Sequence, residues 1–204
     1  MRRPLLLATR SEGKLRELRP LFAEAGFDTI DLGDAGVIAT SDEDALESFD
    51  TFAENARAKA RYFHRLSGGI PTVADDSGLE VTALGGAPGV RSKRWSGRLD
   101  LQNKALDDAN NALLVERLRG AVDRSARYVC VAAYVDDDRQ IIRRAETHGR
   151  ILDTPRGDGG FGYDPYFLSD ELGATFGESS LADKERVSHR GRAMRALVDA
   201  LRAG

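Results

Sequence analysis

The sequence predicts an α/β fold built around a mixed β-sheet with flanking helices. Short apolar runs typical of buried strands alternate with segments whose apolar residues recur at helical spacing. Two strand-like runs, 128–135 and 140–151, flank an acidic turn and indicate an antiparallel hairpin. With 204 residues and 41% hydrophobic content, the chain is long enough to bury a substantial core.

The first elements are a strand and a helix joined by a polar turn. Residues 5–8 are apolar and indicate a buried strand, and residues 9–13 form the turn. Leu15, Leu18, Phe22 and Ala25 then recur on one face of a helix. Pro20 lies inside this helical pattern, where a proline costs about 3 kcal/mol, so we expect a kink or a broken helix there.

A second helix is predicted from about residue 51 to 65. Thr51 and Glu54 have the spacing of a capping box, and apolar residues follow at helical intervals. The helix should end near Gly68 and Gly69. The run 70–74 then predicts a second strand that leads directly into a tight turn at 75–78.

The remainder alternates in the same way. Residues 103–119 predict a helix, and the hairpin follows it. A glycine-rich stretch, 156–165, precedes a short apolar run at 166–168, and Ser188 can cap a final helix. There is no internal repeat, low-complexity tract or linker, so we expect one domain over 1–204.

Composition excludes several classes of protein. The formal net charge is only -3 and no long block has one sign, which argues against binding a nucleic-acid polymer or a membrane surface. The apolar run near the N-terminus is too short for a signal peptide or a membrane span, so we expect a cytoplasmic protein. The single Cys130 indicates a buried thiol, and the three histidines lack the spacing of a zinc site.

The loop ATRSEGK at 8–14 is the first candidate site. It presents backbone amides at a helix start together with Lys14, an arrangement that attracts phosphate. It is not a Walker A loop, because Ala8 replaces the required glycine and Leu15 replaces the serine or threonine. The alternative is a solvated connection.

Asp75 and Asp76 form the second candidate. Adjacent carboxylates at the end of a strand suit magnesium, which binds one or two protein oxygens and completes its shell with water and phosphate. The alternative is an Asp-Ser-Gly turn in which these side chains only cap backbone amides.

Two further segments complete the candidates. In GGFGYDP, 159–165, the glycines permit close backbone approach and the aromatic rings can stack on a base, although a hairpin loop with core aromatics has the same pattern. His189 and Arg190 begin the last helix, where cations oppose the helix dipole unless a ligand offsets their charge. The alternative there is two solvated side chains.

In this order, the strings LATRSEGK, TFAENA, ADDSGLEVTALGGAPGV, GGFGYDP and SHRGRA resemble the inosine/xanthosine triphosphate pyrophosphatases, from about Leu5 to Leu201. The resemblance implies an elongated two-lobed fold with a nucleotide cleft between the lobes, usually in a homodimer. It also implies magnesium-dependent hydrolysis of ITP, dITP and XTP to the monophosphate and pyrophosphate. Water would attack the α-phosphorus without a covalent intermediate.

The resemblance also implies roles for individual residues. Asp76 would be the catalytic carboxylate and a metal contact, with Glu47 as the second metal contact by spacing and Glu43 as its nearest alternative. The family usually has asparagine where this chain has Ser11. The substrate-binding residues would be Thr9, Arg10, Ser11, Glu12, Gly13, Lys14, Ser77, Phe161, Gly162, Tyr163, Asp164, Lys184, His189 and Arg190.

Two other functions fit parts of the pattern. A Maf-like nucleotide pyrophosphatase opens with a similar strand and polar loop, but it would lack the GGFGYDP and SHR segments. A nucleotide-binding module would bind nucleotide and magnesium without releasing pyrophosphate. The loop at 8–14 lacks the Walker A pattern, which weighs against a kinase.

Overall fold

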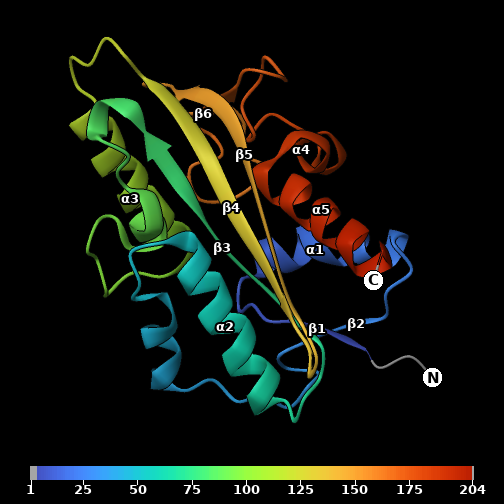
Figure 1. Cartoon of the computed structure of the whole chain (residues 1–204). Helices are drawn as coiled ribbons and strands as arrows, with labels where there is room; N and C mark the ends of the chain where they lie inside the picture. The colour runs from blue at the N-terminus through green and yellow to red at the C-terminus, as the bar shows by residue number, and fades with distance from the viewer. Residues whose placement is uncertain (1–3, 204) are drawn as a thin grey trace. The chain divides into compact units, whose positions relative to one another are not determined.

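The computed structural model describes residues 4–203, apart from the side chain of Asp44. Within that range the strands form a six-stranded sheet of order β2-β1-β3-β4-β5-β6 (Figure 1). β1 pairs in parallel with β2 and β3, whereas β5 pairs antiparallel with β6, so the predicted mixed sheet is confirmed. The strands are β1 Leu5–Leu7, β2 Thr29–Asp31, β3 Thr72–Val81, β4 Ser125–Val135, β5 Gln140–Ile151 and β6 Phe167–Ser169.

The predicted helices are confirmed. The α-helices are α1 Glu12–Glu24, α2 Phe52–Leu66, α3 Asn103–Arg117, α4 Leu181–Val187 and α5 His189–Ala203, and the 3-10 segments are η1 Ser41–Glu47, η2 Thr82–Leu84 and η3 Gly89–Arg94. The predicted N-cap of α2 is confirmed, since Thr51 Oγ1 accepts a hydrogen bond from Glu54 N at 3.2 Å and donates one to Glu54 Oε2 at 2.6 Å. The short α4 was not predicted. Its start is capped by Ser180, whose hydroxyl accepts from Asp183 N at 3.1 Å.

One local prediction was wrong, and another was wrong in part. α1 runs unbroken through Pro20, because Leu18, Leu21 and Phe22 on either side of it are buried in the core and offset the lost backbone hydrogen bond. The broken helix is thus excluded, and the kink stays a prediction. β3 continues to Val81, so residues 75–78 are extended strand rather than a tight turn. Asp75 and Asp76 therefore lie inside a strand.

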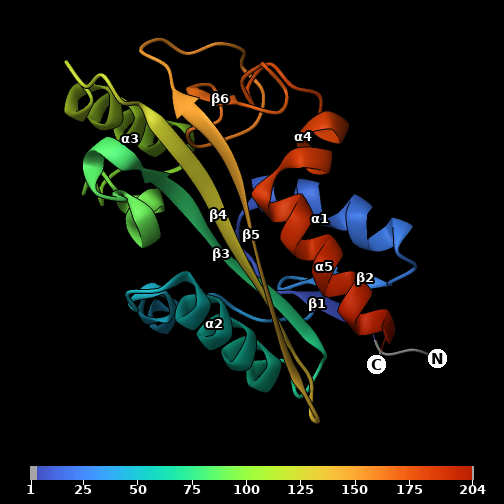
Figure 2. The same cartoon turned by 45° about the horizontal axis from the view of Figure 1, so that its top comes forward.

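The chain forms two compact units, and the first contains the residues up to Asp76, Cys130–Ala145 and the residues from Arg190. In this unit α1 and α5 lie side by side, and α2 lies on the other side of the sheet (Figures 1 and 2). The core between α1, α5 and the strands includes Leu7, Phe22, Val73, Cys130 and Met194. The predicted burial of Cys130 is confirmed, since its side chain is fully buried.

The second unit contains Ser77–Val129 and Glu146–His189. Its core joins Leu114 of α3 and Leu118, the C-cap of that helix, to strand residues and to an aromatic group. Tyr128 lies 4.7 Å from Phe167 and 5.9 Å from Phe176, measured between ring centroids. The prediction of a single domain over 1–204 stays a prediction.

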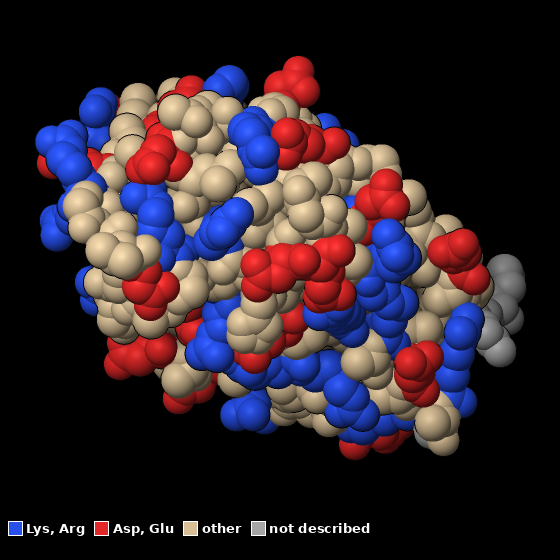
Figure 3. Space-filling model, turned by 90° about the horizontal axis from the view of Figure 1, so that it is seen from above, with Lys and Arg blue, Asp and Glu red and all other residues tan. Residues whose placement is uncertain are grey.

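The surface agrees with the balanced composition. On the face drawn in Figure 3, acidic and basic side chains are interspersed. Across the described residues, no helix is both long and apolar enough to cross a membrane.

Candidate active site

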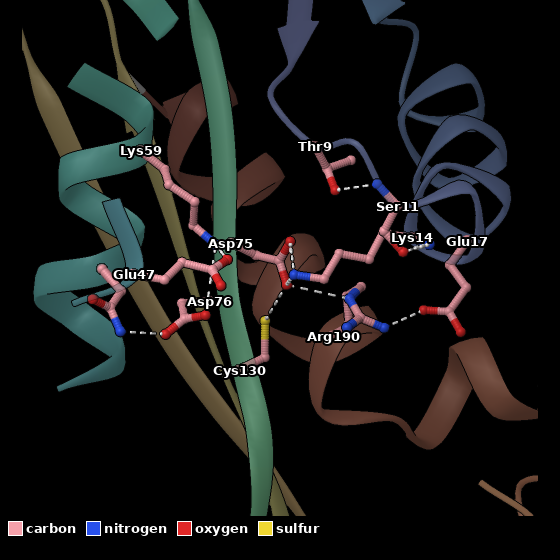
Figure 4. A network of polar contacts seen from close by, with 11 residues as sticks. Thr9, Ser11, Lys14, Glu17, Glu47, Lys59, Asp75, Asp76, Cys130 and Arg190 are labelled. Carbon is pink, nitrogen blue, oxygen red and sulfur yellow. Dashed lines mark hydrogen bonds and ion pairs between the residues drawn. The ribbon is translucent and has the colours of Figure 1, made fainter. Parts of the chain in front are cut away.

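Two adjacent carboxylates on β3 organise the polar residues of the first unit. Consecutive residues of a strand point to opposite faces of the sheet. Asp75 accordingly points toward Lys14 and Arg190, and Asp76 points toward Lys59 and Asn55 (Figure 4). The two carboxylates therefore meet different partners.

Asp75 is buried against two cations. Its oxygens lie 2.9 and 3.0 Å from Lys14 Nζ, and Arg190 Nε lies 3.4 Å from Oδ2. Burial alone would raise the pKa of Asp75, but the charges of Lys14 and Arg190 hold that pKa well below its usual range. Arg190 also pairs through Nη1 with Glu17. Asp75 is thus a fixed anion that orients Lys14 and Arg190.

Asp76 has a different environment. Its Oδ2 accepts a hydrogen bond from Asn55 Nδ2 at 2.9 Å, and its Oδ1 lies 3.5 Å from Lys59 Nζ. Lys59 Nζ also lies 2.8 Å from Glu47 Oε1. Burial raises the pKa of Asp76, and the charge of Lys59 offsets only part of that rise. A carboxylate with a raised pKa in a polar site is suited to accept a proton.

The polar loop before α1 has the predicted form. Ser11 is the N-cap of α1, and its hydroxyl accepts from Lys14 N at 3.4 Å. Thr9 Oγ1 accepts from Ser11 N at 3.1 Å. Glu12 and Gly13 begin the helix. The loop therefore presents a helix N-terminus beside Lys14, as a phosphate site requires.

The structure distinguishes the two acidic candidates for the metal. Glu43 forms a two-point ion pair with Arg10, at 2.7 and 3.1 Å. Glu47, in contrast, shares the Lys59 ammonium with Asp76. This geometry favours Glu47 as the partner of Asp76.

The carboxylates of Glu47 and Asp76 supply oxygen ligands of the kind that a divalent cation binds. A cationic nitrogen already lies between them, which shows that this position favours positive charge. Across the described residues, no group of three or more His, Cys, Asp or Glu could hold a metal. Magnesium needs no such group, because one or two carboxylates together with phosphate and water satisfy it.

The second unit contains residues 159–165, which we call the base loop because the resemblance implies that this segment holds the base. Asp164 of this loop forms an ion pair with Lys184 of α4 at 2.6 Å, and both side chains are at most 5% exposed. Asp164 Oδ2 also accepts from Phe161 N at 2.7 Å. Lys184 Nζ lies 4.9 Å from the ring centroid of Phe161, within the range of a cation–π contact. The carboxylate of Asp164 thus holds the start of the base loop and the lysine together.

His189 belongs to the same unit. Its ring stacks on Tyr128, with centroids 4.5 Å apart and an interplanar angle of 5°. The Tyr128 hydroxyl donates to Asp164 Oδ1 at 3.3 Å. His189 and Arg190 are only 3% and 4% exposed, so the alternative of two solvated side chains is wrong.

Comparison with known proteins identifies the family. Residues 5–200 match the model of the Ham1 family. The chain belongs to the Ham1 family. It is 49% identical to a dITP/XTP pyrophosphatase of Ralstonia nicotianae, covering 98% of this chain and 97% of the relative, and 44% identical to a dITP/XTP pyrophosphatase of Thermus thermophilus, covering 98% and 92%. The solved structure of a HAM1 protein from Coxiella burnetii superposes with a TM-score of 0.84 at 33% identity, covering 100% of both chains.

Sequence reasoning missed several residues of this Ham1 family site. Asn55 and Lys59 lie one turn apart on α2, and both are buried. A buried amide and a buried lysine among the apolar residues of a helix are the signal that could have revealed them. Glu17 on α1 is buried in the same way and pairs with Arg190. The predicted substrate contact of Ser77, which follows Asp76 on β3, stays a prediction.

Proposed function

We propose that this member of the Ham1 family hydrolyses deaminated purine nucleoside triphosphates, ITP, dITP and XTP, to the nucleoside monophosphate and pyrophosphate. The relatives from Ralstonia nicotianae and Thermus thermophilus bear the name dITP/XTP pyrophosphatase. The observation that carries the proposal is the difference in surroundings between the two adjacent carboxylates of β3. Asp75 is neutralised by Lys14 and Arg190, whereas Asp76 has a raised pKa and lies beside Glu47 and Lys59.

The reaction needs a base and a cation. Asp76 orients a water molecule and accepts its proton while the water oxygen bonds to the α-phosphorus. The bond from that phosphorus to the bridging oxygen breaks, and its electron pair leaves with pyrophosphate. Lys14, held at the start of α1 by Asp75, offsets the negative charge that develops on the leaving group. The α1 amides near Ser11 bind the phosphate oxygens.

We assign Mg²⁺ to the carboxylates of Asp76 and Glu47. When bound, the ion would neutralise phosphate charge and lower the pKa of a bound water molecule. Among the described side chains of this network, the carboxylates of Asp75, Asp76, Glu47 and Glu17 face three cations, Lys14, Lys59 and Arg190.

The purine base is assigned to the base loop and His189. Phe161 supplies an aromatic face, and Lys184 and Asp164 fix its position. A 6-keto purine presents an acceptor where adenine presents an amino donor, so a donor from His189 at that edge selects hypoxanthine and xanthine over adenine. The contact of Arg190 with the substrate stays a prediction, because its described partners are Asp75 and Glu17.

The decisive experiment measures product formation from ITP, dITP, XTP, dATP and dGTP, with and without Mg²⁺. With Mg²⁺ present, we expect ITP, dITP and XTP to yield pyrophosphate and the monophosphate. Without Mg²⁺, we expect neither product. A diphosphate and orthophosphate as first products would contradict the mechanism. Nucleotide binding without pyrophosphate release would instead show a binding module.

We also propose that the chain acts as a homodimer, as the family resemblance implies. Light scattering of the purified protein measures its mass directly. A mass near 22.2 kDa across the concentrations used in the assay would show a monomer and reject this proposal.

A further inference from the structure

Helix α3 carries polar residues that the proposed reaction does not use. Asp107, Asn110 and Asn111 lie on one side of α3, at the i, i+3 and i+4 positions. Asn110 and Asn111 are buried, at 3% and 5% exposure. Buried side-chain amides are nearly always hydrogen-bonded, so the partners of these residues show which groups they hold in place.

Two of these side chains hold one residue of the base loop from both sides. Asp107 Oδ2 accepts from Gly162 N at 2.8 Å, and Asn111 Nδ2 donates to Gly162 O at 2.9 Å. Both polar groups of a single residue are therefore bound to one rigid helix. This arrangement fixes the position of the loop and also its rotation.

The neighbouring segment extends the same support. Asn110 accepts from Ser96 N at 2.8 Å and donates to Lys93 O at 3.0 Å. Just before that segment, Ser92 O accepts from the hydroxyl of Tyr163 at 2.7 Å. The hydrogen bonds run from α3 to residues 92–96, from there to Tyr163, and from Gly162 back to α3. Hydrogen bonds thus connect the base loop to α3 both directly, at Gly162, and through residues 92–96.

We propose that Asp107 and Asn111 are positioning residues that set the selectivity between 6-keto and 6-amino purines. The inference rests on the proposed function, in which the base loop binds the purine. A donor directed at the 6-position rejects adenine only if the surrounding loop cannot shift to relieve the mismatch. By holding Gly162 on both sides, the two α3 residues prevent that shift.

The test compares kcat/KM for dITP and dATP, which differ at the 6-position of the base. Asp107→Ala removes a hydrogen bond to a charged acceptor, so we expect the dITP to dATP ratio to fall about 10- to 100-fold. Asn111→Asp replaces the donor with a carboxylate facing a carbonyl, and we expect a fall of at least about 10-fold. Asp107→Asn keeps an acceptor oxygen and should restore most of the ratio.

The matched control is Asp108→Asn on the same helix. Asp108 is exposed and pairs with Lys104 at 2.8 Å, so this change should leave the ratio as in wild type. Circular dichroism and thermal unfolding confirm that each variant is folded. If Asp107→Ala does not fold, Asn111→Asp, which hardly changes side-chain volume, carries the test.

The outcomes separate the two proposals. If the wild-type protein releases no pyrophosphate from any purine triphosphate, the proposed function fails. If the wild type discriminates between dITP and dATP but the α3 variants lose activity on both substrates equally, the positioning role is overturned. An unchanged ratio in Asn111→Asp overturns it as well.

Discussion

Replacing Gly160 by alanine should damage the base loop through one collision. Gly160 has φ of +73°, and a Cβ added there would lie 2.8 Å from both Cβ and Cγ of Asp164. Real Cβ atoms do not approach other carbon atoms so closely, so Asp164 must move. That movement breaks its ion pair with Lys184 and its hydrogen bond from Phe161 N.

Gly162 provides a matched control two residues away. Its φ is +63°, and an added Cβ would meet nothing within 4 Å. An alanine with positive φ lowers the free energy of unfolding by roughly 1–2 kcal/mol at either position. Replacing glycine by alanine also reduces the conformational entropy of the unfolded chain by the same amount in both variants. Breaking a buried ion pair by displacing one partner costs about 3–5 kcal/mol. We therefore expect Gly160→Ala to lower the free energy of unfolding by about 3 kcal/mol more than Gly162→Ala.

Urea unfolding followed by tryptophan fluorescence and circular dichroism measures both variants. Pyrophosphate release from dITP should fall further in Gly160→Ala than in Gly162→Ala, because only the first displaces Asp164. Unfolding free energies that agree within about 1 kcal/mol would refute the reasoning, since the strain of a left-handed alanine is common to both.

Four further variants probe the first unit. Asp76→Asn should lower turnover at least about 100-fold with the fold intact; near wild-type turnover would make the carboxylate structural. Asp76 must be ionised to act, so activity falls as pH drops through its raised pKa; Lys59→Met removes a charge that lowers this pKa, and the acid limb of the kcat/KM profile should move to higher pH. Arg190→Ala removes the buried ion pair with Glu17 and one of the two cations beside Asp75, and should destabilise the fold by about 3–5 kcal/mol; a selective loss of ITP over ATP hydrolysis in a stable variant would instead place Arg190 at the base. Ser11→Asn keeps an N-cap side chain and should change KM little, whereas lost activity would show that the loop is misassigned.

Local signals were enough to predict most of the elements. Thr51 and Glu54 specify the start of α2 through their own hydrogen bonds, and the hairpin of β4 and β5 is closed by a turn in which Asp136 N donates to Arg139 O at 3.1 Å. Such features depend on residues close in sequence. They were therefore accessible without knowledge of the tertiary structure.

The errors came from contacts distant in sequence. The Asp-Ser-Gly run in β3 has turn propensity, but the sheet imposes an extended conformation on it. Pro20 disfavours a helix locally, yet the buried residues around it keep α1 continuous. The partners of the two aspartates come from α1, α2 and α5, so Asn55, Lys59 and Glu17 could not be assigned from spacing alone.

Because Asp75 and Asp76 point to opposite faces of the sheet, the contacts of both carboxylates depend on the register of β3. A slip by one residue sends every side chain of a strand to the other face. Leu7 of β1 is paired with Val73 of β3, two positions before Asp75. One residue inserted between Val73 and Asp75 would turn the first carboxylate toward Lys59 and Glu47. The second would reach the face of Lys14, but about 6.6 Å beyond the position that Lys14 and Arg190 contact. The chain would keep both carboxylates and still leave Lys14 and Arg190 without the anion between them, so tolerance to insertion in β3 should be far lower than its sequence composition suggests.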